Sequence, residues 1–124
     1  MEATVNKQAA INGYAAFSAM DADAAMKDVS DSIEWVVGGD NSLTGTYRGK
    51  EEVGGFWMKL LEKGFKNTPK EFVAEGNKVV AICDVELDGE HVESADLLTF
   101  DDEGRLTRFE TIGSYELMDR TFAR

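Results

Sequence analysis

The sequence predicts a single α+β domain, residues 1–124, in which helices cover one face of a bent β-sheet. A chain of 124 residues, 43% hydrophobic and with one proline, has the size and composition of one globular domain. Apolar residues recur at helical spacing in its first half and alternate at strand spacing in its second half. Short turn sequences separate the strands, so neighbouring strands must be antiparallel. Helices followed by such strands are typical of α+β domains.

Two helices are predicted before the first strand. Residues 3–20 form the first helix, because apolar side chains recur there at helical spacing: Ala10, Ile11, Tyr14 and Phe17. Asp21 can cap a shorter second helix. The period then changes to two around Trp35, which predicts a strand over 32–37, followed by a glycine-rich loop at 38–42.

The third predicted helix, over 50–62, has the clearest pattern. One apolar stripe runs along it and comprises Val53, Phe56, Trp57, Leu60 and Leu61. Gly64 is a natural stop for this helix.

A β-meander is predicted after Pro69. Its strands cover about 70–75, 78–87, 91–100 and 105–113, with turn sequences such as Asp88-Gly89 between them. The tail places Tyr115, Met118 and Phe122 at helical spacing, so it forms a closing turn or a short helix.

The charge of the chain excludes some functions. Thirteen basic and 24 acidic residues give a net charge of −11, spread evenly along the sequence. Such a surface repels phosphate backbones and anionic lipids, so we expect neither a nucleic-acid partner nor a membrane partner. No apolar run approaches the roughly 20 residues of a membrane span, and no signal peptide is recognisable at the N-terminus.

The scarcity of cysteine and histidine bounds the chemistry further. Cys83 is the one cysteine, so no intrachain disulfide is possible, and we expect a reducing, cytoplasmic environment. The simplest interpretation of Cys83 is a small buried apolar residue. His91 is the one histidine, which disfavours a zinc site or a histidine-based triad, and we expect no metal.

Asp96 is a charged residue within an apolar pattern. On the strand over 91–100 it shares the more apolar face with Val92, Ser94, Leu98 and Phe100. It is either a partly exposed acid on a twisted strand or a carboxyl group in an apolar cavity, with its pKa raised by desolvation. Tyr14 lies on the buried stripe of the first helix; it is either core or the hydrogen-bond partner that a buried acid needs.

Further candidates are residues that could line a cavity. Asp84 lies on the mixed face of its strand, at the surface or at a rim. Four aromatic residues are most simply core, but in a curved sheet covered by helices they could line a cavity: Phe17, Trp35, Phe56 and Trp57.

These elements, in this order, resemble the nuclear transport factor 2-like (NTF2-like) superfamily, and within it the SnoaL-like proteins related to ketosteroid isomerases. The resemblance covers essentially the whole chain, and its best local marks are residues 35–39, 45–53 and 101–108. It implies a cone, in which a curved, mostly antiparallel sheet wraps around three helices. It also implies an apolar pocket open at one end and a homodimer formed through the sheet. Because the superfamily includes enzymes and non-catalytic binding domains, the fold alone does not choose between them.

The resemblance also implies roles for individual residues. In ketosteroid isomerases a tyrosine and a protonated aspartic acid hold the enolate oxygen, while an aspartate moves the proton. The first two positions fall on Tyr14 and Asp96. Counting forward from Tyr14 puts the base at Val37 or Gly38, whereas counting back from Gly49 puts it at Asp40. Asp40 is therefore a displaced base or merely a loop acid.

SnoaL-type cyclases use an acid–base carboxylate and need neither metal nor cofactor. Glu110 on the last strand could serve in that role or could simply pair with Arg108. The sequence thus supports two hypotheses. One is a cofactor-free enzyme acting on a small apolar carbonyl compound, with Tyr14 and Asp96 holding the oxygen and Asp40 moving the proton. The other is a non-catalytic binding or structural domain.

Overall fold

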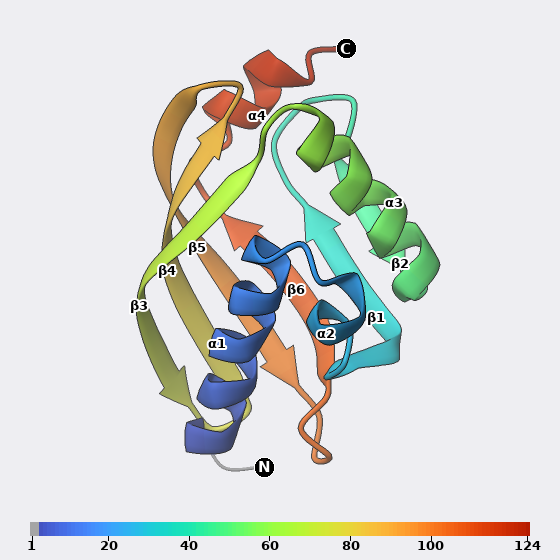
Figure 1. The fold of residues 1–124 in the computed structure, drawn as a ribbon, viewed down its shortest axis with the longest axis vertical. Coiled ribbons are helices and arrows are strands. Elements are labelled where there is room, and N and C mark those ends of the chain that lie inside the picture. The colour runs from blue at the N-terminus through green and yellow to red at the C-terminus, as the bar shows by residue number, and fades with distance from the viewer. Residues whose placement is uncertain (1–2) are drawn as a thin grey trace.

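A computed structural model describes residues 3–124; Met1 and Glu2, the start of the predicted domain, lie outside the described residues. The part of the chain described here contains one mixed sheet with four helices (Figure 1). The elements are α1 Ala3–Ser18, α2 Ala22–Ala25, β1 Val29–Val37, β2 Gly45–Arg48, α3 Gly49–Glu62, β3 Lys66–Glu75, β4 Lys78–Leu87, β5 Glu90–Phe100, β6 Leu106–Ile112 and α4 Glu116–Thr121.

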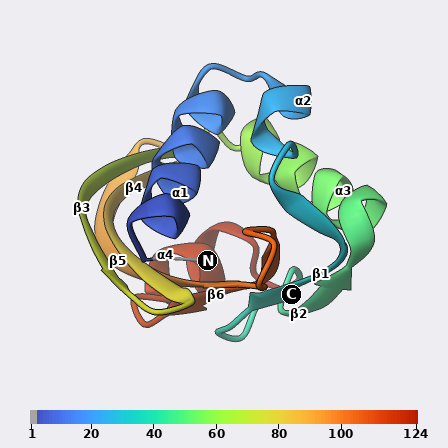
Figure 2. The ribbon, with the colours of Figure 1, turned by 90° about the horizontal axis from the view of Figure 1, so that it is seen from below.

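The six strands form one curved sheet in the order β2-β1-β6-β5-β4-β3. Neighbouring strands are antiparallel, except that β1 and β6 run parallel. Seen from below, the sheet bends around a space that α1, α2 and α3 close from the other side (Figure 2). The predicted α+β class, with a curved, mostly antiparallel sheet wrapped around three helices, is confirmed. The short helix α4 covers the end of the sheet at the top of Figure 1.

The strands β4 and β5 follow the predicted alternation. Buried side chains on β4 occupy every second position: Val79, Ala81, Cys83, Val85 and Leu87. Cys83 is therefore a buried, free thiol. The turn between these strands contains Asp88 and Gly89, both at positive φ (52° and 81°), as expected for a two-residue hairpin turn.

Two strands differ from the prediction. β3 begins at Lys66 and runs through Pro69, where the prediction placed a break. Proline is tolerated there because β3 is an edge strand, and the pairing register shifts between Pro69 and Glu71. β2 was not predicted, because its four residues are too few to show a period; it pairs with β1, with Tyr47 opposite Trp35.

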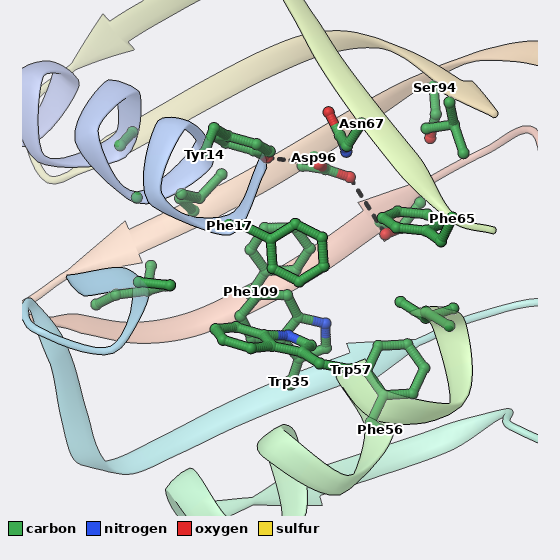
Figure 3. A pocket seen from close by; sticks show the side chains of 18 of the residues that line it. Tyr14, Phe17, Trp35, Phe56, Trp57, Phe65, Asn67, Ser94, Asp96 and Phe109 are labelled. Atoms are coloured by element: carbon green, nitrogen blue, oxygen red, sulfur yellow. Dashed lines mark hydrogen bonds between the residues drawn. The ribbon is translucent and has the colours of Figure 1, made fainter. Parts of the chain in front are cut away.

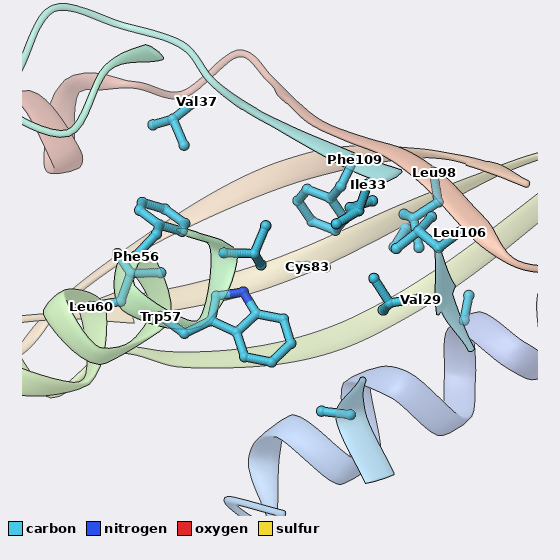
Figure 4. Packing of buried hydrophobic residues seen from close by; sticks show 14 of the residues in the cluster. Val29, Ile33, Val37, Phe56, Trp57, Leu60, Cys83, Leu98, Leu106 and Phe109 are labelled. Carbon is cyan, nitrogen blue, oxygen red and sulfur yellow. The ribbon is translucent and has the colours of Figure 1, made fainter. Parts of the chain in front are cut away.

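The core lies between the sheet and α3. Four of the five residues in the predicted apolar stripe of α3 are buried, with Val53 fully inaccessible, and Leu61 is half-buried. The stripe faces Ile33 of β1, which is also fully inaccessible, and side chains from β5 and β6 complete the cluster (Figure 4). No helix within residues 3–124 is long and apolar enough to cross a membrane.

Candidate functional site

A cavity of about 350 Å³ lies between the concave face of the sheet and the helices. Its walls are mostly aromatic and aliphatic, and five of its lining rings form one chain of contacts: Phe65, Phe17, Trp57, Trp35 and Phe109. Trp35 and Phe109 stack with centroids 3.8 Å apart, and Trp57 meets Trp35 edge-on at 5.5 Å (Figure 3). Such a volume and lining are typical of small-molecule sites. The predicted lining by Phe17, Trp35, Phe56 and Trp57 agrees with this cavity.

Asp96 is the buried acid in the wall of this cavity, with 3% of its surface exposed. It lies on the inward face of β5, opposite Ala81 of β4 and Thr111 of β6. The hydroxyl of Tyr14, which α1 directs at the sheet, donates to Asp96 Oδ2 at 2.5 Å. Thr111 Oγ1 donates to Asp96 Oδ1 at 3.2 Å, and Cys83 Sγ lies 3.8 Å from Oδ2. The two residues that the sequence singled out independently are thus in direct contact.

Two neighbours of Asp96 were not predicted. Thr111 follows Phe109 by two positions on β6 and so shares its inward face, a signal that the sequence contained. Asn67 of β3 lies beside Asp96 (Figure 3). It belongs to the part of β3 that the prediction assigned to a connection. Its Oδ1 atom is buried and has no hydrogen-bond partner.

Burial decides the protonation of this cluster. Desolvation raises the pKa of Asp96 to about 6, although hydrogen bonds from Tyr14, Thr111 and Cys83 act to lower it. Burial and the nearby carboxylate raise the pKa of Tyr14 well above its usual value, and they raise the pKa of Cys83 to about 12. Near neutral pH, Asp96 is therefore the member of the cluster that changes charge.

Asp40 does not reach the cavity, so its prediction as the base is wrong in position. It lies in the loop after β1 with its side chain 84% exposed, and it pairs with Arg124 at 3.0 Å. Val37 and Gly38, the other positions considered for a base, do line the cavity. Neither has a group that can take a proton.

Asp84 and Glu110 face away from the cavity, which corrects the prediction of Asp84 as a lining residue and of Glu110 as an acid–base carboxylate in the pocket. Asp84 lies between the buried Cys83 and Val85, so alternation turns it to the outer face, where it lies 3.0 Å from His91. Glu110 lies on the outer face of β6, with its Oε1 3.9 Å from Arg108, the pairing that the sequence left open.

Comparison with known proteins identifies the family. A family model described as SnoaL-like domain matches residues 11–109. The chain belongs to this family. A search of curated proteins finds no match.

Solved structures show the same fold for this SnoaL-like domain. An NTF2-like protein from Burkholderia pseudomallei is 21% identical, with a TM-score of 0.83 over 97% of this chain and 98% of its own. TerC, co-crystallised with polyporic acid, is 24% identical, with a TM-score of 0.82 over 97% and 99%. A provisionally named polyketide cyclase from Sinorhizobium meliloti is 19% identical, with a TM-score of 0.73 over 85% and 94%. The predicted membership of the NTF2-like superfamily is confirmed.

One end of the cavity in this SnoaL-like domain is closed by α4 and the residues before it. Tyr115 packs on Gly38 so closely that a Cβ atom there would lie 2.7 Å from the tyrosine ring. The Tyr115 hydroxyl donates to the carbonyl of Thr111 at 2.9 Å, which links this closure to β6, whose Thr111 side chain donates to Asp96. Within residues 3–124, no cluster of three or more acidic, histidine or cysteine side chains is arranged to hold a metal ion.

Proposed function

We propose that this SnoaL-like domain binds a small, largely apolar carbonyl compound and transfers a proton on it without a cofactor. The observation that carries the proposal is the contact between Asp96 and Tyr14 in the wall of an otherwise apolar cavity. A buried carboxyl group with a pKa of about 6 can accept a proton and return it near neutral pH. Two structural neighbours, the provisional polyketide cyclase and TerC with polyporic acid, are consistent with small-molecule use of this fold.

In the proposed reaction Asp96 acts first and Tyr14 acts second. Ionised Asp96 removes a proton from the carbon next to the carbonyl. The electron pair of that C–H bond forms a C=C bond, and the π pair of the carbonyl moves to its oxygen. Once Asp96 is protonated, it no longer needs the hydrogen of Tyr14, which can then be donated to the enolate oxygen. Return of the proton to the same carbon gives exchange, and return to another carbon gives isomerisation or sets up cyclisation.

The second candidate is binding without catalysis. The observation that favours it is the absence of a second carboxylate at Val37 and Gly38, where the resemblance to ketosteroid isomerases places the base. In that case the carboxyl and hydroxyl groups orient a ligand oxygen, and no proton leaves carbon.

Hydrogen–deuterium exchange of a model ketone separates the two candidates. In D2O, we expect the protein to accelerate loss of the methyl protons of 2-acetylnaphthalene, measured by NMR, by about a hundredfold or more over Asp96→Asn. The rate should rise with pH around the Asp96 pKa of about 6, because the ionised form is the base. Asp84→Asn, a change on the outer face, is the matched control and should exchange like wild type.

The same ligand gives a readout for binding alone. 2-Acetylnaphthalene should bind more tightly than 2-isopropylnaphthalene, which has the same shape but no oxygen. Binding without exchange would replace the enzymatic proposal with the binding one. Equal affinities for the two ligands would contradict both.

The outer face of the sheet is the proposed surface of a homodimer. Two apolar rows cross it in register: Val73, Val80 and Leu97 on β3 to β5, and Ile82, Ala95 and Ile112 on β4 to β6. Val73 and Ile112 are 54% and 49% exposed, which is unusual for a face with no partner. Light scattering should give twice the chain mass for wild type and the single-chain mass for Leu97→Lys. A monomeric wild type at micromolar concentration would contradict the dimer.

A further inference from the structure

The carboxyl group of Asp96 has no cationic partner in the protein. None of the ion pairs formed by residues 3–124 includes it. Lys27 is the one basic side chain that lines the cavity, and it is exposed to solvent. Inside the cavity, an ionised Asp96 is therefore a negative charge held by hydrogen bonds alone.

Aromatic rings surround the space next to this charge. Phe17 and Phe65 lie beside the Asp96–Tyr14 pair, and Trp57, Trp35 and Phe109 lie behind them (Figure 3). Ring faces attract cations within about 6 Å, and tryptophan does so best. A buried carboxylate among tryptophan and phenylalanine rings is the chemical environment that recognises an ammonium group.

We infer that the cavity also takes a second class of ligand: apolar or aromatic amines, whose ammonium group pairs with Asp96 among these rings. This inference shares with the proposed function only the premise that ligands reach Asp96, and it does not depend on any catalysis. Free carboxylate oxygens present about four acceptor positions, and Tyr14, Thr111 and Cys83 occupy at most three of them. At least one position is left for an N–H donor.

The folded protein already bears the free-energy cost of desolvating Asp96. Burial disfavours the ionised carboxyl group before any ligand arrives. An ammonium group next to it restores a favourable Coulomb interaction where the local dielectric constant is low. The ligand must lose its own hydration, but the aromatic faces compensate part of that loss.

The pH dependence of amine binding has one source within the cluster. The groups that face Asp96 are Tyr14 from α1, Cys83 from β4, Thr111 from β6 and Asn67 from β3. Thr111 and Asn67 do not titrate, and the pKa values of Tyr14 and Cys83 are raised, so both stay neutral. Amine affinity should therefore rise by about tenfold between pH 5 and pH 7, as Asp96 ionises.

Three ligands with one skeleton test the inference. The amine is 1-(naphthalen-2-yl)ethylamine, the neutral isostere is 2-isopropylnaphthalene, and the ketone is 2-acetylnaphthalene. At pH 8 and about 0.15 M salt, which screens attraction to the acidic surface, calorimetry should show about tenfold or tighter binding of the amine than of the isostere. Asp96→Asn should remove this advantage. Tyr14→Phe keeps the charge of Asp96 and should keep the advantage of the amine. The rise in amine affinity should then occur at higher pH, because a hydrogen bond that lowers the Asp96 pKa is lost.

The outcomes for the two proposals are separate. Equal affinity for amine and isostere, or an amine advantage that survives in folded Asp96→Asn, would overturn the inference whatever the ketone does. Failure of the ketone to bind better than the isostere would reject the proposed function but leave the amine result standing. Circular dichroism of Asp96→Asn confirms that the comparison is made on folded protein.

Discussion

Asp96→Asn is expected to gain stability relative to the wild type as the pH rises. The pKa of Asp96 is about 6 in the folded chain, against an ordinary value of 3.8, because burial disfavours the charged form. Between these two values the unfolded chain releases a proton that the folded chain retains, so the wild type loses stability as the pH rises through this range. The loss amounts to about 3 kcal/mol by pH 8 and is complete above the folded pKa. Asparagine cannot ionise, and it retains groups that can hydrogen-bond with Tyr14 and Thr111.

The measurement is urea unfolding of both proteins at pH 4, 6 and 8. The difference in free energy of unfolding, variant minus wild type, should increase by about 2–3 kcal/mol from pH 4 to pH 8, because a small part of the loss has already occurred at pH 4. Other titrating groups are common to both proteins and cancel in this difference. Asp102→Asn, at an exposed position in the turn between β5 and β6, should give a nearly constant difference. Parallel curves for wild type and Asp96→Asn would mean that Asp96 is not desolvated in the folded chain.

The pairing of Asp96 with Tyr14 was within reach of sequence reasoning. The alternation along β5 is regular, so one acid among apolar residues on one face was visible as an exception. Tyr14 fell on the buried stripe of a helix with a clear period. Both signals depend on local periodicity, and α1 and β5 form as regular elements, so each side chain faces the way its period predicts. What the sequence could not supply was the distance between them, because 82 residues separate the two side chains.

The wrong predictions arise where periodicity breaks. Asp40 follows the end of β1, and a loop position has no period from which to infer a direction. On β6, Phe100 pairs with Leu106 while Thr99 pairs with Arg108, which leaves Thr107 as an extra residue. This bulge buries Leu106 although Arg108 and Glu110 point outward, so simple alternation along the strand predicted over 105–113, which would place all three on one face, does not hold. Asn67 was missed because the strand was predicted to begin after Pro69, whereas β3 begins at Lys66.

Replacing Trp57 with alanine is expected to cost about 3–5 kcal/mol of stability, a large share of the total for a domain of this size. Trp57 is 8% exposed and sits on the buried stripe of α3. Its ring meets Phe17 of α1 edge-on at 5.1 Å and Trp35 of β1 at 5.5 Å. It thus joins two helices and the sheet at the wall of the cavity. Its loss removes one edge-on contact from each neighbouring ring, although Phe17 still contacts Phe65 and Trp35 still stacks on Phe109. Trp57→Phe keeps one ring and should cost less than half as much.

Urea unfolding of the two variants, with Met58→Ala as the control, measures this effect. Met58 is the next residue on the same helix and is 61% exposed, so its replacement should change stability by about 0.5 kcal/mol or less. The affinity for 2-acetylnaphthalene should fall in Trp57→Ala and be unchanged in Met58→Ala, since only Trp57 lines the cavity. A Trp57→Ala protein as stable as Met58→Ala would show that the aromatic wall does not connect α1, α3 and the sheet. In that case the cavity would owe its shape to the aliphatic core around Ile33 and Val53 instead.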